Sequence, residues 1–421
     1  MGNTMSCTCK CSCRSSGATE DNSTVDKPIS STSYPVPFGH VAYTPSLPGA
    51  MGPIWDFPLE WWYYAGWATD VTGTKQYTIL MQTVRANKLQ SLLPGINAVL
   101  LYGIGFHQVG SPGQSFATNF VPGSGTFPPP TSSSWSTSFQ SLSPPAAMDC
   151  ELTSGVLGLA GAEYELSMSF NDVINSVSTK FMVKDTFGMV LEGASGAFHK
   201  AGGSNSYEYA APCLTIQEGS TITMNGEETH LAGGSLWLDR QTIGGPIGQS
   251  YHEQFTTSQS SPGNSKSLYT GNWVVVQLND KPIYNLVFFW PKKSEQWIVG
   301  TKLKPPEKPL KTIGLEYPSL STWDNESPVQ GVNVLESTEF DLNILNPENP
   351  SSSPHWKSPT SGQTYCSAWQ LTIKEEVYTM KALIPGSEVF LGTFFFEGAA
   401  ILTDENGHKV GNAYVEQMGY N

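Results

Sequence analysis

A carboxyl group directly beside four consecutive aromatic residues is the feature of this chain best suited to chemistry. The segment Glu60–Tyr64 reads Glu-Trp-Trp-Tyr-Tyr. Neighbouring residues of a strand point to opposite faces, so these rings must face both sides. Rings around Glu60 would remove water from it, and desolvation raises the pKa of a carboxyl group. Glu60 is therefore a candidate acid for an apolar molecule. The structural alternative is a barrel wall in which Glu60 bonds a backbone amide or an arginine.

Three other features of the sequence bear on acid chemistry, metal binding and hydrolysis. Glu397 follows three phenylalanines, Phe394 to Phe396, and we assign it a structural role. The seven histidines form neither His-x-His nor His-Glu-x-x-His, so we expect no metal site. No Gly-x-Ser-x-Gly motif occurs, which argues against a serine hydrolase.

Length, charge and composition limit the classes of protein to consider. A chain of 421 residues favours two domains. Its net charge is −14 and it holds no cluster of Lys or Arg, so we expect no nucleic-acid partner. The 41 Gly and 30 Pro, with many Ser, Thr, Val and aromatic residues, favour short strands joined by turns. No run of 18 apolar residues predicts a transmembrane helix.

Local patterns predict antiparallel strands that would position these side chains. Residues Ala368–Lys374 alternate between apolar and polar, and Asn225-Gly226 and Asn406-Gly407 indicate tight hairpins. Further strands are expected at Gln76–Arg85 and in a hairpin over Asn272–Trp290. The Pro- and Ser-rich run Pro112–Pro145 reads as a long loop. Many hairpin-linked strands imply closed or nearly closed barrels.

The N-terminus carries a separate signal for a lipid anchor. Residues Met1–Ser6 fit the N-myristoylation pattern, with Gly2 as the acceptor. Cysteines follow at positions 7, 9, 11 and 13, and we predict acylation of Cys7 and Cys9. One acyl chain binds a membrane only marginally, and a second makes attachment stable. The alternatives are a thiolate metal cluster or a chance match.

This signal predicts how the N-terminal part of the chain is organised and where the protein acts. Residues 1–14 form the lipidated tip, and residues 15–55, rich in Ser, Thr, Pro and Gly, form a flexible linker. The expected partner is a membrane surface, and the expected location is the cytoplasmic face of a membrane, or otherwise the cytoplasm.

Four ordered blocks of the sequence resemble one family. They are Glu60-Trp61-Trp62-Tyr63-Tyr64, then Ser206-Tyr207-Glu208-Tyr209 with Gly233-Gly234-Ser235-Leu236-Trp237-Leu238-Asp239-Arg240, then Trp356–Gly362 with Tyr365 and Trp369, and finally Phe396–Ala399 with Gly411–Tyr420. Together they resemble the carotenoid 1,2-hydratase-like and AttH-like family of lipocalin-like proteins. The resemblance covers roughly residues 56 to 421.

The resemblance implies an all-β fold of two tandem lipocalin-like antiparallel β-barrels, at residues 56–248 and 249–421. It also implies a large apolar substrate and no cofactor. Family members include hydratases and, more distantly, cyclising enzymes, so the fold alone leaves the activity open.

The resemblance points to Asp239 as the first candidate acid, with Glu60 as the second. In a strand, Trp237 and Asp239 share a face, although Asp239 could also pin a barrel corner through Arg240 or the backbone. The chain departs from the hydratases at Trp237, where they have tyrosine, and at Tyr207 and Tyr209, where they have histidine and tryptophan. These changes keep aromatic walls but lose an imidazole. The predicted catalytic residues are Asp239, Glu60 and Tyr207, and the predicted substrate-binding residues are Trp61, Trp62, Tyr64, Tyr209, Trp237 and Trp273.

Two functions fit these residues. The first is a cofactor-independent hydratase, isomerase or cyclase for a terpenoid, polyene or prenylated compound. A protonated carboxyl would donate a proton, and aromatic faces would stabilise the cation that forms. The second is a carrier that holds a hydrophobic ligand in the same place without converting it.

Overall fold

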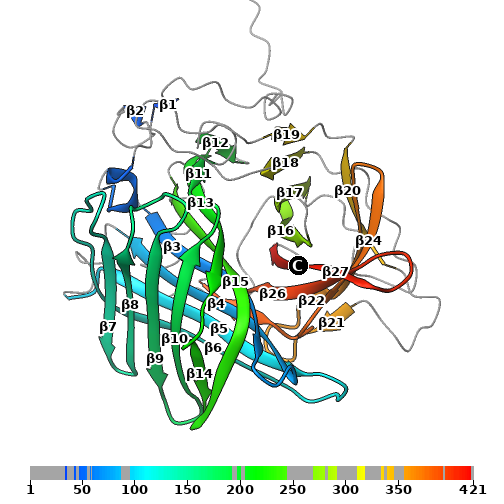
Figure 1. The fold of residues 1–421 in the computed structure, drawn as a ribbon, viewed down its shortest axis with the longest axis horizontal. Helices are drawn as coiled ribbons and strands as arrows, with labels where there is room; N and C mark the ends of the chain where they lie inside the picture. The colour runs from blue at the N-terminus through cyan, green and yellow to red at the C-terminus, as the bar shows by residue number, and fades with distance from the viewer. Residues whose placement is uncertain are drawn as a thin grey trace, which may run out of the picture.

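The protein is almost entirely β-structure in the computed structural model (Figure 1). The structure describes residues 34–35, 42–43, 47–54, 57, 59–86, 95–191, 197–200, 204–243, 269–279, 283–291, 311–317, 333–335, 339–345, 355–391 and 394–418. Its one helical element in these ranges is the 3-10 turn η2 (Gly49–Met51). No helix in the described part is long and apolar enough to span a membrane.

The first large sheet closes on itself as an antiparallel barrel. Its strands are β3 (Leu59–Asp70), β4 (Lys75–Ala86), β5 (Ala98–Gln108), β6 (Gln114–Thr126), β7 (Ser136–Leu142), β8 (Pro145–Ser154), β9 (Glu163–Asn171), β10 (Ser176–Asp185), β11 (Val190–Leu191), β12 (Ala197–Lys200), β13 (Ser204–Ile216), β14 (Thr221–Met224) and β15 (Glu227–Ile243). Strands β3 to β10 pair in sequence order. The circle closes because β10 pairs with β13 and β14, and both pair with β15, which returns to β3.

The second large sheet forms a nearly closed barrel. Its strands are β16 (Tyr269–Leu278), β17 (Ile283–Pro291), β18 (Lys311–Tyr317), β19 (Asn333–Leu335), β20 (Phe340–Ile344), β23 (Ala368–Ile373), β24 (Glu376–Ala382), β25 (Glu388–Phe390), β26 (Phe394–Thr403) and β27 (Lys409–Met418). Two short pairs complete the described structure, β1 (Tyr34–Pro35) with β2 (Ala42–Tyr43), and β21 (His355–Lys357) with β22 (Thr364–Cys366). The predicted fold of two antiparallel barrels is confirmed.

Most local predictions agree with the structure, and one is wrong. Asn225-Gly226 turns β14 into β15, with φ of 51° and 85°, as a tight hairpin turn requires. The run Pro112–Pro145, expected to be a loop, contains β6 and β7. These strands bury alternate residues such as Val121 and Phe139, and put polar residues such as Ser124 and Gln140 on the outer face between the buried positions. The run was predicted as a loop because small polar residues on the outer face of these strands are also typical of loops.

The two barrels pack directly against each other. Strands β26 and β27 contact β3 and β4, while β25 contacts β5 and β6. Each barrel has its own apolar interior. A third buried cluster lies between the barrels and includes Tyr63 and Leu80 of the first and Phe395 and Tyr414 of the second. The interface is therefore apolar and continuous with both walls.

The chain before β3 covers one end of the first barrel. Met51 is fully buried there, and its carbonyl oxygen accepts hydrogen bonds from the indole nitrogens of Trp62 and Trp135 at 3.0 and 3.2 Å. The linker predicted over residues 15–55 thus includes packed chain at its end. The acylation sites predicted at Gly2, Cys7 and Cys9, and the domain boundary predicted at residue 248, lie outside the described residues.

Candidate functional site

Strand β3 divides the four consecutive rings between two environments. Trp62 and Tyr64 point into the first barrel, where they join its main apolar cluster. Trp61 and Tyr63 point out of that barrel, toward the second. Their alternation follows from the pleat of the strand. The predicted substrate-binding residues Trp61 and Trp62 therefore cannot line one surface.

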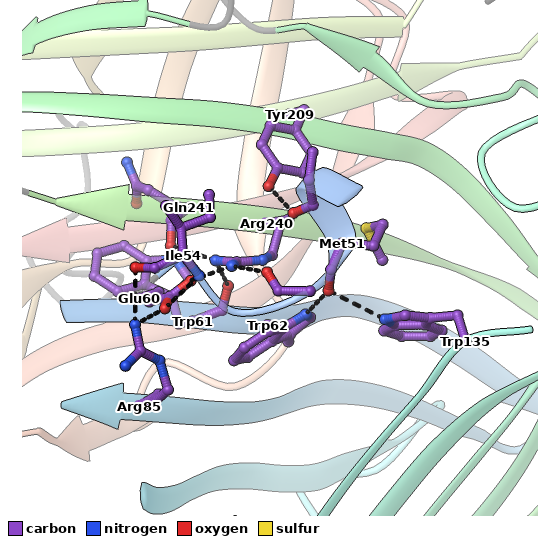
Figure 2. A network of polar contacts seen from close by, with 12 residues as sticks. Met51, Ile54, Glu60, Trp61, Trp62, Arg85, Trp135, Tyr209, Arg240 and Gln241 are labelled. Atoms are coloured by element: carbon purple, nitrogen blue, oxygen red, sulfur yellow. Dashed lines mark hydrogen bonds and ion pairs between the residues drawn. The ribbon is translucent and has the colours of Figure 1, made fainter. Parts of the chain in front are cut away.

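Glu60 lies at the centre of a buried ionic network (Figure 2). Its two carboxylate oxygens pair with the guanidinium groups of Arg85 and Arg240. Both oxygens also accept the backbone N–H of Ile54, at 2.9 and 3.0 Å. The side chains of Glu60, Arg85 and Arg240 are at most 2% exposed.

The two arginines also bind the segment that covers the barrel end. Arg240 donates to the carbonyl oxygen of Gly52 at 2.7 Å and lies over the ring of Trp62, 4.1 Å from its centroid. Arg85 donates to the carbonyl of Ile54 at 3.0 Å. Burial and the charge of Arg240 lower the pKa of Arg85 to about 9, so it stays cationic at neutral pH.

This geometry does not suit Glu60 as a proton donor. Opposite charges in direct contact favour the ionised carboxylate, and both of its oxygens are occupied. The alternative derived from the sequence, a wall glutamate bonded to an amide and to arginine, matches the structure. Glu60 anchors residues 52–54 to the barrel wall.

The predicted site residues on β13 and inside the first barrel also make packing contacts of a structural kind. The hydroxyl of Tyr209 donates to the carbonyl oxygen of Ala50. Tyr207 makes an edge contact with Phe57, with ring centroids 5.5 Å apart. Tyr64 is buried in the barrel interior. The structure thus separates Tyr64, Trp62, Tyr207 and Tyr209 from the candidate residues that face the second barrel.

Trp273 of β16 lies at the centre of an aromatic cluster between the barrels. Its ring makes edge contacts with Tyr63 and Trp237 of the first barrel, both at 5.8 Å between centroids. It also contacts Tyr414 of its own barrel at 6.4 Å. The structure therefore brings together Trp237 and Trp273, which were predicted from distant parts of the sequence.

Asp239 belongs to this same inter-barrel group. It is half-buried on β15, and its Oδ2 lies 3.5 Å from the indole nitrogen of Trp61, a long hydrogen bond. In the antiparallel register it stands directly opposite Tyr63 of β3. Asp239 and Trp237 share the outward face of β15, as the sequence predicted.

Sequence reasoning gave Glu397 only a structural role, and the structure places its carboxyl group at the interface between the barrels. It is 2% exposed on β26, and its Oε2 accepts a hydrogen bond from the hydroxyl of Tyr63 at 2.8 Å. Glu416 stands opposite it on β27. Burial, and next the negative charge of Glu416, raise the pKa of Glu397 well above its usual range.

The signal for Glu397 was present in the sequence. Both glutamates adjoin a run of aromatic residues. Glu60 precedes Trp61–Tyr64, and Glu397 follows Phe394–Phe396. The two segments were indistinguishable locally. Their environments differ because Glu60 meets two arginines, whereas Glu397 meets a tyrosine hydroxyl and another carboxyl group.

The site unites acid groups and aromatic rings from both barrels. Asp239 and Tyr63 come from the first barrel, and Glu397 and Trp273 come from the second. Within the described residues, no group of three or more His, Cys, Asp or Glu side chains is arranged to hold a metal ion. The arrangement can hold a proton at Glu397 and present π-faces to a developing positive charge.

No protein-family model and no curated protein sequence matches this chain. Solved structures do match over nearly its whole length. One is a protein assigned as AttH from Nitrosomonas europaea, with 15% identity, a TM-score of 0.57, and 90% of this chain and 97% of that chain covered. Another is kievitone hydratase from Nectria haematococca, with 13% identity, a TM-score of 0.51, and 94% and 98% covered.

These similarities define the class of fold. The chain shares the tandem-barrel fold of both proteins over 90% and 94% of its length. The family resemblance drawn from the sequence motifs is thereby confirmed at the level of the fold. At 13–15% identity the match assigns no activity to this chain.

Proposed function

We propose that the protein is a cofactor-independent enzyme that hydrates, isomerises or cyclises an apolar polyene, terpenoid or prenylated compound between its two barrels. The observation that carries this proposal is the buried Glu397, bonded to Tyr63 of the inter-barrel aromatic cluster, with Asp239 opposite Tyr63 on the neighbouring strand. A carboxyl group kept neutral near neutral pH is a general acid. That one protein of the same fold is named a hydratase is compatible with this chemistry.

In the proposed reaction, Glu397 supplies the proton. Its transfer to a carbon–carbon double bond forms a carbocation, which the faces of Trp237 and Trp273 stabilise. The cation then adds water, loses a different proton or closes a ring.

Asp239 completes the reaction in this proposal. It accepts the proton released by the added water or by the substrate. Protons exchanged with solvent restore the neutral Glu397. The indole N–H of Trp61 can only donate, so its contact suits an ionised Asp239.

The test begins with protein purified from its own cells, native mass spectrometry and solvent extraction. We expect a co-purifying apolar compound, and we expect fresh protein to convert the extracted compound. Asp239→Asn and Glu397→Gln should still bind it but lose at least 100-fold in turnover. Glu163→Gln, a change at an exposed surface pair with Lys184, should keep full turnover.

Two outcomes would contradict the enzyme proposal. If the wild-type protein returns the compound unchanged, the protein is a carrier. If both carboxyl variants convert it at the wild-type rate, the inter-barrel carboxyl groups are not the catalytic acid and base.

A further inference from the structure

Exposed aliphatic side chains gather at one end of the first barrel. In the described part of the chain, the exposed large hydrophobic residues are Val71, Val109, Leu142, Val156, Val173, Ile174 and Val377. Six of these seven lie at or beside connections of the first barrel: Val156 lies between β8 and β9, and the other five, Val71, Val109, Leu142, Val173 and Ile174, lie at or beside the turns that join β3 to β4, β5 to β6, β7 to β8 and β9 to β10. We call these five residues the apolar rim.

The strand register places the rim residues around one barrel mouth. They belong to the hairpins β3–β4, β5–β6, β7–β8 and β9–β10, which follow one another in the sheet. The turn from β9 to β10 lies at the lower end of the barrel in Figure 1, as does the turn from β14 to β15. Residues 47–54 cover the opposite end, beside Trp62 and Arg240.

Three of the five rim residues are almost fully exposed, and the other two, Val71 and Val109, are 62% and 47% exposed. Val173 is 102% exposed, Leu142 is 85% exposed and Ile174 is 82% exposed. Fully exposed aliphatic side chains at hairpin tips contribute nothing to the barrel core, and burying them elsewhere is favourable. All five rim residues lie at the same end of the barrel, which distinguishes them from hydrophobic residues scattered singly over a surface.

The turns at the apolar rim carry no positive charge that would attract them to an anionic surface. The turns at residues 71–74, 109–113, 143–144, 172–175 and 225–226 contain no Lys or Arg. Asp172 lies beside Val173, and the nearby Lys75 is paired with Glu227 at 2.5 Å. Binding through this end must therefore rest on apolar contact, with no help from acidic lipid headgroups.

We propose that the apolar rim inserts into the interfacial region of a lipid bilayer. Protein interfaces are enriched in aromatic residues, Met and Arg, and none of the five rim residues is of these types. Aliphatic side chains spread over four turns suit a fluid surface, which can surround each of them. The barrel mouth thus faces the membrane, whatever reaction the inter-barrel site performs.

The length of the N-terminal chain is compatible with this orientation. Position 2, the predicted acylation site, precedes residue 47 by 45 residues, which can span at most about 150 Å. The 12-residue strand β3 spans only about 40 Å. An anchor at Gly2 and the rim could contact the same bilayer. One acyl chain needs a second membrane contact for stable attachment, and the rim would supply one.

The proposal is tested with the full-length chain carrying Gly2→Ala, produced in bacteria so that no acyl group contributes. Binding is measured by co-sedimentation with vesicles of pure phosphatidylcholine. We expect binding, and we expect the Val173→Asp/Ile174→Asp double variant to lose at least tenfold in partition. Val377→Asp, a matched change at an exposed valine of the second barrel, should bind like its parent.

Further measurements decide the outcome. Vesicles with added phosphatidylserine should bind no more tightly than pure phosphatidylcholine. Circular dichroism should show that the rim variant remains folded. The proposal is overturned if the parent protein does not bind the vesicles or if the rim variant binds them as well as its parent does. Loss of self-association in the rim variant, with no effect on vesicles, would instead assign this end to a second copy of the chain.

Discussion

Two glutamates with similar local sequences have opposite electrostatic environments in this protein. Glu60 is paired with Arg85 and Arg240, which favours its ionised form. Glu397 is buried with Tyr63 and faces Glu416 across the strand pair, which favours its neutral form. The first glutamate suits a structural role and the second suits proton donation.

At the residue scale, we expect Glu60→Gln to destabilise the protein severely. The change leaves two buried guanidinium groups without their shared carboxylate, and breaking a buried ion pair typically costs about 3–5 kcal/mol in free energy of unfolding. Urea denaturation would measure the loss. Glu163→Gln removes an exposed pair with Lys184 and should leave the unfolding midpoint nearly unchanged. Equal stability of Glu60→Gln and the wild type would show that the network is unimportant.

A second residue-scale prediction concerns the pH dependence of stability. Because the pKa of Glu397 is higher in the folded protein than its usual 4.5, the folded state binds more protons above that pH. This group therefore lowers the free energy of unfolding as pH rises, by at most about 1.4 kcal/mol per pH unit, up to its folded pKa. Glu397→Gln should remove this slope.

The measurement is urea denaturation of the wild type and Glu397→Gln between pH 5 and 8. The stability of the variant relative to the wild type should rise with pH. Asp185, whose pKa burial raises to about 6, contributes a slope of the same sign to both proteins and cancels in the difference. Parallel curves would mean that Glu397 titrates normally.

At the scale of elements, β3 has a double function in the architecture. Its even-numbered side chains such as Trp62 and Tyr64 fill the first barrel, while its odd-numbered side chains such as Trp61 and Tyr63 face the second. Strand β3 also lies very close to β15 at Gly66. A Cβ atom added at Gly66 would lie 2.0 Å from the carbonyl oxygen of Ser235.

We therefore expect Gly66→Ala to destabilise the first barrel by about 1–3 kcal/mol, the usual range for overpacking. The methyl group can fit only if β3 and β15 move apart where they pair. Thermal unfolding would measure the change. Gly233→Ala, on the same strand pair, adds a Cβ with no atom within 4 Å and serves as the control. Similar losses in both variants would refute the steric explanation.

At the scale of the whole molecule, the interface makes the two barrels one functional body. Tyr63 and Glu397 bond across it, and the backbone N–H of Ala399 donates to the hydroxyl of Thr78 at 2.8 Å. The buried cluster between the barrels is apolar. An interface of this kind opposes free motion of one domain against the other.

Trp273→Ala tests this coupling, because its ring contacts Tyr63 and Trp237 across the interface. We expect one unfolding transition in calorimetry of the wild type. The variant should lose about 3 kcal/mol, at the lower end for tryptophan truncation because Trp273 is only partly buried, and its transition should separate into two. Leu142→Ala, at an exposed position, should keep the wild-type profile. A single unshifted transition in Trp273→Ala would contradict the coupling.

The sequence by itself determined several strands and hairpins and the class of fold, although it did not reveal β6 and β7. Alternation at Ala368–Ile373 and the Asn225-Gly226 turn depend on neighbouring residues, and local backbone preferences decide such features. The ordered family motifs added the two-barrel architecture, which the structure and its structural relatives confirm. Asp239 and Trp237 were placed on one face of a strand for the same local reason.

Only the tertiary structure decided which carboxyl group can hold a proton. Arg85 lies 25 positions from Glu60 and Arg240 lies 180, while Tyr63 lies 334 from Glu397. The tertiary structure also divided the predicted aromatic residues between the interior of the first barrel and the interface between the two barrels. The charge state of a buried group depends on the groups around it in space, and those are set by strand register and by the packing of the barrels.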